Sequence, residues 1–263
     1  MAKKAIVTLA IGSAYAERFE RCCRAGWSAY AGRHGYDLVV ITEPLDKSER
    51  ARKRSPSWQK CLILSVPELA AYERVVWADS DICINPAAPS IVDEVPPELI
   101  GATDEHRFPN PEARQIILEA IIASSPQDAE FGARYWETWR DPGVWHGAIG
   151  VATGQKHIVQ GGVLVLSAKH HREVLEHIYY AYEDRNLNYE MRALSYEVLA
   201  CGLQCWIDPR FNALLWWMYL QRSMHGPQIE TENQLADFVR DSYRRSYFLH
   251  FAGCAHLMSI LSG

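Results

Sequence analysis

Apolar positions along the chain recur at two spacings, one typical of strands and the other of helices. Residues 5–10 form a short apolar run, residues 14–34 repeat apolar positions at helical intervals, and residues 36–42 are strand-like again. Gly12 and Ser13 separate the first strand from the helix. A strand, a helix and a second strand in this order predict two parallel strands joined by a right-handed crossover, with a ligand crevice at their carboxyl ends.

Strands and helices continue to alternate through the rest of the chain. Buried strands are expected at residues 74–78 and 162–167, and Thr231 with Gln234 resembles a capping box before a helix that ends near Arg245. We expect further helices at residues 56–72, 112–124, 127–140, 169–185 and 189–201, and short strands at residues 204–207 and 247–250. The irregular range 99–156 is interpreted as a helical insertion into a single α/β domain that spans residues 1–263.

Composition and charge exclude several classes of protein. The 263 residues are 48% hydrophobic and 22% charged, which is typical of a globular fold of enzyme size. The net charge of −5 provides no positive field for a phosphate backbone, so nucleic-acid binding is not expected. No run approaches the roughly 20 apolar residues that cross a bilayer, and the first apolar run is too short for a signal peptide. Seven cysteines without a C-x-x-C pair favour reduced thiols, and we expect a cytoplasmic protein.

Two aspartates follow the strand at residues 74–78. Asp79 and Asp81 flank Ser80 at the point where this buried strand ends. Side chains that leave the end of a strand project into the crevice where α/β folds bind ligands. Two adjacent carboxylates favour a divalent cation such as Mg²⁺ or Mn²⁺, which completes its shell with substrate phosphates and water. A turn that merely caps the next loop is the alternative interpretation.

The D-x-D motif belongs to a series of short motifs that runs from residue 5 to about residue 256. The series comprises residues 7–9 with 14–16 at the first strand and turn, Trp-Gln-Lys at 58–60, the strand and D-x-D at 75–81, Gln-Gly-Gly at 160–162, the acidic helix start at 189–195 and His-x-x-Gly at 250–253. In this order the motifs resemble the nucleotide-sugar glycosyltransferases of the GT-A fold, most closely the retaining glycosyltransferase family 8 that includes glycogenin. The resemblance implies an α/β fold in which helices flank a mixed, Rossmann-like central sheet.

The resemblance also implies roles for the matching residues. Asp79, Asp81 and His250 would hold the metal ion, Mn²⁺ or Mg²⁺, and Glu190 and Gln160 would act at the sugar. The remaining positions would bind the nucleotide and phosphates of the donor, and they are Leu9, Ile11, Gly12, Tyr15, Lys60, Asp79, Ser80, Gly161, Gly253 and His256. Ordinary structural roles stay open for several of them: a core histidine, a solvated helix glutamate and an exposed helix lysine.

Three positions depart from the family pattern. His256 stands where the family usually has a lysine on the diphosphate, and it carries a full charge only at lower pH. Met191 replaces a glutamine and offers no amide oxygen to the anomeric centre. Gln160 replaces an asparagine. These changes bear on the identity of the sugar and on the stereochemical outcome more than on the class of donor.

The function implied by the resemblance is metal-dependent transfer of a sugar from a nucleoside diphosphate sugar, such as a UDP-sugar or GDP-sugar, with retention of configuration. The acceptor would be a sugar, a lipid-linked molecule or a small molecule. An inverting enzyme would need a general base, for which His146 and Glu190 are candidates. A sugar-phosphate nucleotidyltransferase and a non-catalytic nucleotide-sugar-binding protein are the alternatives, although the first would carry a Gly-rich, Arg-containing turn that residues 11–14 lack.

Three clusters outside these motifs have more than one interpretation. The tryptophans of the insertion, Trp136, Trp139 and Trp145, either stack on an acceptor or form core, and we favour core. Residues 214–219 are interpreted as core as well. The basic run at residues 50–54 is a solvated loop, a lid over the diphosphate, or a contact with anionic lipid that would make the protein peripheral to a membrane.

Overall fold

The computed structural model describes residues 3–127, 129, 131–151, 153–183, 189–226 and 228–262. Within these residues a mixed sheet of six strands forms the centre, in the order β2-β1-β3-β6-β5-β7. The strands are β1 (Lys4–Leu9), β2 (Tyr36–Ile41), β3 (Arg74–Ala78), β5 (Ile100–Asp104), β6 (Val159–Leu166) and β7 (Gln204–Trp206). Strand β1 is parallel to β2 and β3, whereas β6 is antiparallel to β3 and β5. The expected parallel opening and the mixed α/β sheet are therefore confirmed.

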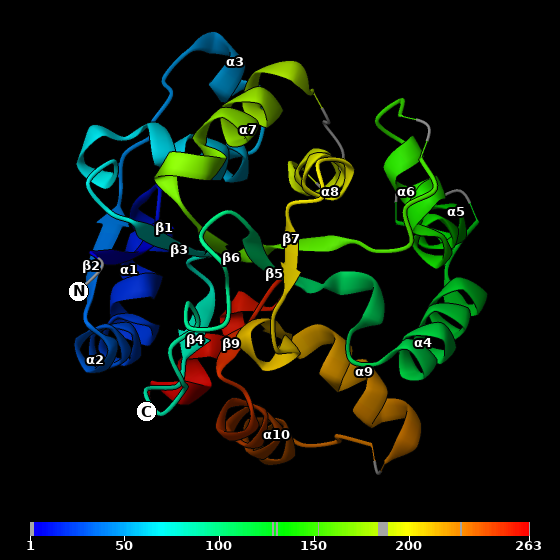
Figure 1. Ribbon diagram of the computed structural model, residues 1–263. Coiled ribbons are helices and arrows are strands. Elements are labelled where there is room, and N and C mark those ends of the chain that lie inside the picture. The colour runs from blue at the N-terminus through cyan, green and yellow to red at the C-terminus, as the bar shows by residue number, and fades with distance from the viewer. Residues whose placement is uncertain are drawn as a thin grey trace.

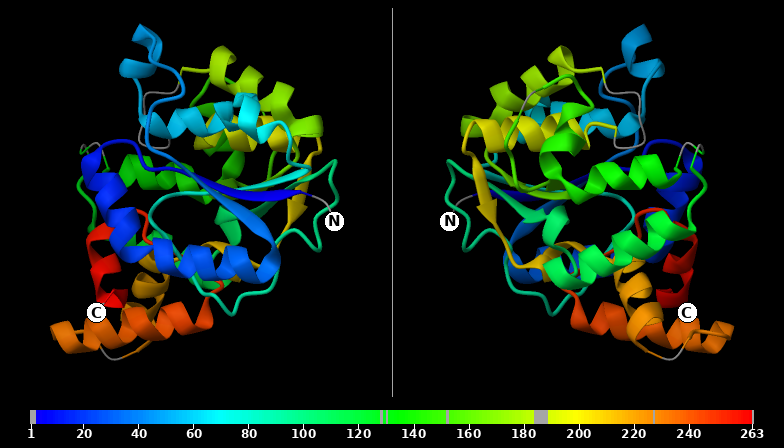
Figure 2. Two further views of the ribbon diagram at one scale, coloured as in Figure 1. Left: turned by 90° about the vertical axis from the view of Figure 1, so that its left-hand side faces the viewer. Right: turned by 90° about the vertical axis from the view of Figure 1, so that its right-hand side faces the viewer.

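Helices cover both faces of the central sheet (Figure 1). One face carries α3 (Glu49–Arg52), the 3₁₀ helices η1 (Pro56–Ser65) and η2 (Pro67–Leu69), α7 (Ala168–Ala181) and α8 (Met191–Ala200). The other face carries α1 (Ser13–Cys22), α2 (Arg24–His34) and α10 (Glu232–Arg245). The side views in Figure 2 show the same helices above and below the sheet. Because both faces are covered, every residue of β3 and β6 is buried.

A hydrophobic cluster fills the space on each side of the sheet. Successive side chains of a strand point to opposite faces, so Val76 of β3 belongs to the cluster with Phe19 and Trp27, whereas Trp77 belongs to the cluster with Trp58. The alternation within one strand thus anchors both helical layers to the same sheet.

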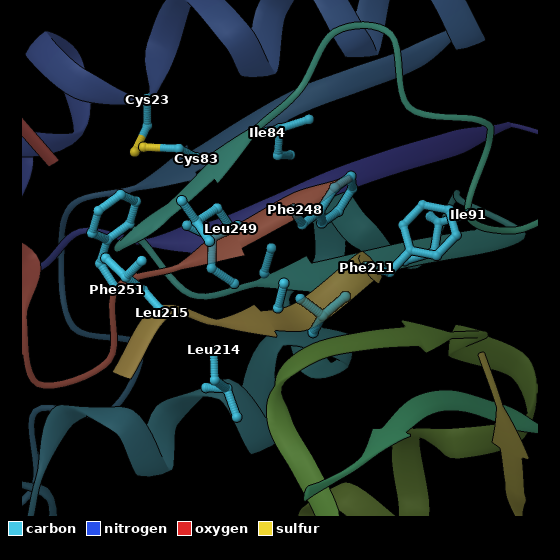
Figure 3. Packing of buried hydrophobic residues seen from close by; sticks show 14 of the residues in the cluster. Cys23, Cys83, Ile84, Ile91, Phe211, Leu214, Leu215, Phe248, Leu249 and Phe251 are labelled. Atoms are coloured by element: carbon cyan, nitrogen blue, oxygen red, sulfur yellow. The ribbon is translucent and has the colours of Figure 1, made fainter. Parts of the chain in front are cut away.

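A smaller sheet lies on the side of α1 and α2, with the strand order β4-β9-β8. Its strands are β4 (Ile82–Ile84), β8 (Ala213–Leu214) and β9 (Phe248–His250). Figure 3 shows side chains of this sheet, among them Phe248 and Leu249, packed in the hydrophobic cluster below the central sheet. Strand β9 is antiparallel to β4, with His250 opposite Ile82. This pairing brings the C-terminal part of the chain to the turn that follows β3.

The range 99–156 is not an insertion throughout, because it begins with β5, a strand of the central sheet. The inserted helices follow this strand. The segments after β5 are η3 (Glu105–Arg107), α4 (Pro111–Ser124), α5 (Ala133–Glu137), η4 (Thr138–Arg140) and α6 (Pro142–Gly147). They lie beside the sheet at the right of Figure 1. The sequence pattern did not predict β5 because Gly101 and the polar pair Thr103 and Asp104 leave no continuous apolar run there.

Other differences from the expected elements have local causes. The single helix expected over residues 14–34 is two helices, and at their junction the Cys23 thiol donates to the carbonyl of Ser80 at 3.6 Å. The helix expected over residues 56–72 is two 3₁₀ helices, with Pro67 at the start of the second. The capping box of Thr231 and Gln234 is confirmed. Residues 128, 130, 184 and 185 of two expected helices lie outside the described residues.

The cluster at residues 214–219 is core only in part. It comprises β8 and the start of α9 (Leu215–His225), which follows the 3₁₀ helix η5 (Pro209–Asn212). Trp217 is buried, but Trp216 is 43% exposed, so the interpretation as core was wrong for that residue. The chain closes with the 3₁₀ helix η6 (Ala255–Leu261). Every helix among the described residues is too short or too polar to span a bilayer.

Candidate functional site

A cleft of about 660 Å³ opens at one edge of the central sheet. The parallel strands β1 and β3 end at this edge, and the antiparallel strand β6 begins there. Most residues singled out by sequence line it: Leu9, Ile11, Tyr15, Lys60, Asp79, Ser80, Asp81, Gln160, Gly161, Glu190, His250 and Gly253. The cleft therefore joins residues from both ends of the chain at the carboxyl ends of the parallel strands, as expected for a ligand site in an α/β fold.

Asp79, Asp81 and His250 converge inside this cleft. Their ligand atoms lie within 4.8 Å of one another, and they are the one such group of three among the described residues. His250 Nε2 is 3.3 Å from Asp81 Oδ1 and 4.0 Å from Asp79 Oδ2. The geometry has a simple origin, because Asp79 N donates to the carbonyl of Gly162 at 2.8 Å and β9 places His250 beside the turn.

A hydrogen-bond chain sets the proton position on His250. The Gln160 amide oxygen accepts from Gly162 N and from Asn212 Nδ2, the latter at 2.9 Å. Asn212 Oδ1 is therefore left to accept, and it lies 2.8 Å from His250 Nδ1. With the proton on Nδ1, the lone pair of Nε2 faces the two aspartates, which is the form that a metal ligand needs. Sequence reasoning missed Asn212, whose only signal is a polar residue next to the apolar run of β8.

Lys60 is buried between two carboxylates rather than exposed on a helix. It is 4% exposed, and its Nζ lies 2.9 Å from Asp79 Oδ1 and 2.7 Å from Glu190 Oε1. It also donates to the carbonyl of Gly161 at 3.1 Å. Burial by itself lowers the pKa of Lys60, but the two carboxylates outweigh it and raise the pKa above its ordinary value. Lys60 is therefore a permanent positive charge inside the cleft.

The two aspartates have different environments. Oδ1 of Asp79 accepts from Lys60 and, at 3.0 Å, from Trp77 Nε1, which leaves Oδ2 toward the other ligands. Burial raises the pKa of Asp79, and the charge of Lys60 only partly opposes this. Burial also acts to raise the pKa of Asp81, but the charge and hydrogen bond of His250 lower it below the ordinary value. Asp81 is thus the carboxylate that holds its charge more firmly.

Two further features fit the cleft for a polar ligand. Glu190 Oε2 is buried and has no hydrogen-bond partner among the described residues, although the other oxygen is paired with Lys60. A buried carboxylate oxygen without a partner is costly unless a ligand supplies the donor. Gly162 leaves no room for a side chain, because a Cβ there would lie 2.5 Å from His250 Cε1. The Glu190 oxygen is thus left to accept a hydrogen bond from a ligand, and the glycine at position 162 leaves room for the His250 ring.

Comparisons with solved structures support the fold. No protein-family model and no curated protein matches the chain. A solved structure described as a glycosyltransferase involved in the glycosylation of the major capsid of PBCV-1 matches 97% of this chain and 99% of its own, at 14% identity and a TM-score of 0.53. The fold is that of the GT-A glycosyltransferases. The apo structure of the bifunctional glycosyltransferase WbbM matches 96% of this chain and 46% of its own, at 13% identity and a TM-score of 0.52. Galactosyltransferase LgtC, in complex with donor and acceptor sugar analogs, matches 98% of this chain and 95% of its own, at 14% identity and a TM-score of 0.47.

The insertion supplies one wall of the cleft in this GT-A fold. Phe131, Tyr135 and Trp136 line the wall, whereas Trp139 and Trp145 are buried outside it. The interpretation as core therefore holds for two of the three tryptophans. Trp136 is the exception, because it is half-buried against the core and also lines the cleft.

Other sequence candidates lie away from the cleft. His146 is 0% exposed, and its Nδ1 and Nε2 are engaged by Pro142 O at 2.6 Å and Ser195 Oγ at 2.9 Å. This position removes it as a general base. His256 lines an adjoining groove with Trp216, and Gly253 borders both the groove and the cleft.

The turn after β1 lies at the cleft, whereas the basic run at residues 50–54 is bound to α7. Gly12 precedes α1 with φ of +92°, a conformation that favours glycine, and its neighbours in the turn line the cleft. Arg50 and Arg54 donate to carbonyls at the end of α7, at Tyr182 and Tyr179 respectively. The basic run is therefore tied to α7, while residues 55–57 just after it line the cleft.

Proposed function

We propose that the protein is a metal-dependent glycosyltransferase that uses a nucleoside diphosphate sugar as donor. The observation that carries the proposal is the convergence of Asp79, Asp81 and His250, within 4.8 Å, in the main cleft of a GT-A fold. Two carboxylates and an imidazole whose Nε2 is directed at them suit Mn²⁺ or Mg²⁺ once the ring is neutral. When bound, the cation would neutralise the charge that develops on the diphosphate leaving group.

The donor has room in the cleft along an axis that begins at β1. Leu9 ends this strand and Ile11 lies in the turn after it, and Tyr15, 56% exposed at the start of α1, offers an aromatic face to a base. The diphosphate would then lie at the metal ligands, and the sugar would extend toward Lys60 and Glu190. The base of the donor would lie at the β1 end of this axis, so the residues there would decide between UDP and GDP donors.

Lys60 and Glu190 supply the chemistry that this chain's own side chains can perform at the sugar. In the transfer, the bond from the anomeric carbon to the phosphate oxygen breaks, and a bond from an acceptor hydroxyl oxygen forms. We infer that Lys60 stabilises the negative charge on the departing phosphate and that Glu190 stabilises positive charge at the anomeric centre. Attack from the leaving-group face needs no protein nucleophile, because the departing phosphate can take the acceptor proton. Retention of configuration is therefore the outcome we propose.

The acceptor would approach from the wall formed by the insertion. Phe131, Tyr135 and Trp136 offer aromatic faces suited to a sugar ring. The exposed Trp216 lines an adjoining groove that shares Gly253 with the cleft. A sugar or a small molecule with an apolar part fits this surface better than a highly charged acceptor.

Calorimetry against a panel of nucleotide sugars, with and without Mn²⁺, tests the proposal. We expect saturable binding of one donor only with Mn²⁺, and loss of that binding in Asp81→Asn. Asp93→Asn, in the loop between β4 and β5, is the matched control and should bind as the unchanged protein does. Unaltered donor affinity in Asp81→Asn would contradict the proposed metal site, because it would show that donor binding does not need Asp81. Binding without donor hydrolysis or transfer to any acceptor would favour a non-catalytic nucleotide-sugar-binding protein instead.

A further inference from the structure

A second cavity, of about 580 Å³, lies beside the sheet and shares no lining residue with the cleft. Residues of η3, α4, η4 and the loop before β6 form its walls. Four cationic side chains line it, Arg107, Arg114, Arg140 and Lys156, against one acidic side chain, Glu119. A local excess of positive charge in a chain of net charge −5 is an arrangement that needs an explanation.

We propose that this cavity is an anion-binding site for the phosphate group of a phosphorylated small molecule. The inference does not depend on the proposed transferase activity, because it concerns different residues and a different cavity. It rests on the hydrogen-bonding state of one buried arginine, on an adjacent histidine and on the unpaired cations at the rim.

Arg114 is the central residue of the proposed site. It is 1% exposed, and its guanidinium lies 4.0 Å from the ring centre of Trp217 and 5.3 Å from that of Trp139. Nη1 lies 3.3 Å from Glu105 Oε1, but Nε and Nη2 are buried without a hydrogen-bond partner. Glu105 is the ion-pair partner of Arg114 among the described residues, and its Oε1 also accepts from Trp217 Nε1 at 2.8 Å, so only one guanidinium nitrogen is engaged. A buried guanidinium with two unused nitrogens favours an external acceptor with several oxygens.

Two histidines add polar groups to the same cavity. His106 Nδ1 is buried and has no hydrogen-bond partner among the described residues. Burial and the charge of Arg114 lower the pKa of His106, so the ring is a neutral donor rather than a cation at neutral pH. His157 is oriented by Asp104, whose Oδ2 lies 2.6 Å from its Nδ1. Asp104 also acts electrostatically on Arg114, so a ligand at this cavity would share the field of the arginine with that carboxylate.

The rim cations are available to a ligand. Arg140 is paired with Glu137 at 3.2 Å, whereas Arg107 and Lys156 are exposed and have no ion-pair partner in the described part of the chain. Arginine donors match the oxygens of a phosphate group, and the lysine adds a compact positive charge. The cavity is also larger than a lone phosphate ion, which leaves space for the organic part of a small molecule. An extended polyanion is not favoured, because the positive charge is confined to one cavity.

Titration of the full chain with inorganic phosphate tests the proposal. Calorimetry is run without divalent metal and at constant ionic strength, so that neither the cleft nor general screening contributes. We expect saturable binding that weakens about tenfold or more in the double variant Arg107→Gln and Lys156→Gln. The matched control replaces Arg240 and Arg244, two exposed arginines of α10, with glutamine and should leave phosphate affinity unchanged. Arg114→Lys keeps the charge but removes guanidinium donors, and it should also weaken binding.

Three results would overturn the proposal. They are the absence of saturable binding at millimolar phosphate, equal loss of binding in the α10 control, and unchanged binding in the double variant Arg107→Gln and Lys156→Gln. A phosphorylated small molecule that binds more tightly than inorganic phosphate, and competes with it, would support the larger ligand. If Arg114→Lys does not fold, the rim variants still decide the question, because their side chains are exposed.

Discussion

Asn212 Oδ1 accepts the Nδ1 proton of His250 at 2.8 Å, and this one contact determines which ring nitrogen faces the aspartates. The contact joins η5 to β9, and the pairing of β9 with β8, the strand directly after η5, holds the two segments side by side. Without it, the His250 ring could carry its proton on Nε2 and present no lone pair to a cation.

Replacing Asn212 with leucine should therefore weaken Mn²⁺ binding by about 10–100-fold, as is typical when the partner of a ligating histidine is lost. Asn212→Asp keeps an oxygen acceptor for Nδ1–H and should retain most of the affinity. Calorimetry with Mn²⁺ alone measures both. Asn110→Ala serves as control, because it removes the N-cap of α4 and should lower stability without changing metal affinity. Wild-type Mn²⁺ affinity in Asn212→Leu would show that the contact has no positioning role.

Metal affinity should rise with pH across the range in which His250 loses its proton. Burial acts to lower the pKa of His250, but the charge and hydrogen bond of Asp81 raise it above the ordinary value of about 6.5. In the metal-free protein this ion pair stabilises the fold below the unfolded-state pKa, and its contribution is lost as pH rises through the folded pKa. A cation must displace the same proton, so Mn²⁺ binding should be weak at pH 6 and level off once His250 is neutral.

Mn²⁺ titrations at a series of pH values check this dependence. His250→Gln should bind weakly at every pH and lose most of the rise. A wild-type affinity that does not change between acid and neutral pH would contradict the role of His250 as a ligand, because no proton would then compete with the metal.

Lys60→Met should destabilise the protein by about 3–5 kcal/mol, since it leaves Asp79 and Glu190 as buried carboxylates without their cation. Urea unfolding measures the loss. Adding Glu190→Gln to this variant removes one of the two charges and should recover part of the stability. Lys53→Met, which breaks the exposed pair with Glu49, is the control and should cost about 0–1 kcal/mol. A loss as small as the control's would mean that Lys60 is not needed to neutralise the cleft.

His146 should make the fold sensitive to mild acid. Burial lowers the pKa of His146 to about 4, against about 6.5 in an unfolded chain. Because the unfolded state binds the proton first, stability is complete above pH 6.5 and falls by about 1.4 kcal/mol per pH unit down to pH 4. The hydrogen bonds explain the cost: Nδ1 donates to Pro142 O, so Nε2 must accept from Ser195, and protonation would remove that acceptor.

Denaturant unfolding between pH 4 and pH 7 tests this prediction for His146. His146→Gln should be less stable at pH 7 but should have a shallower dependence on pH. His170→Gln, at an exposed position on α7, should have the wild-type dependence. An unchanged slope in His146→Gln would assign the acid sensitivity to other groups.

Local pattern alone determined much of the fold and two of the three residues of the candidate metal site. The alternation near the N-terminus predicts the parallel opening, and the capping box of Thr231 predicts the start of α10, because both depend on residues a few positions apart. Asp79 and Asp81 could be placed at a strand end for the same reason. The motif order further indicated a GT-A fold, and the match to solved structures agrees with it.

Only the tertiary structure decided which distant side chains meet. Trp136 reaches the cleft, whereas Trp139 belongs to the core, although both have the same chemistry and lie one helical turn apart. Lys60 is a buried counter-ion, and Asn212 orients His250, through contacts between segments that are far apart in the chain. A side chain's burial and partners depend on how several elements pack together, and no short stretch of sequence contains that information.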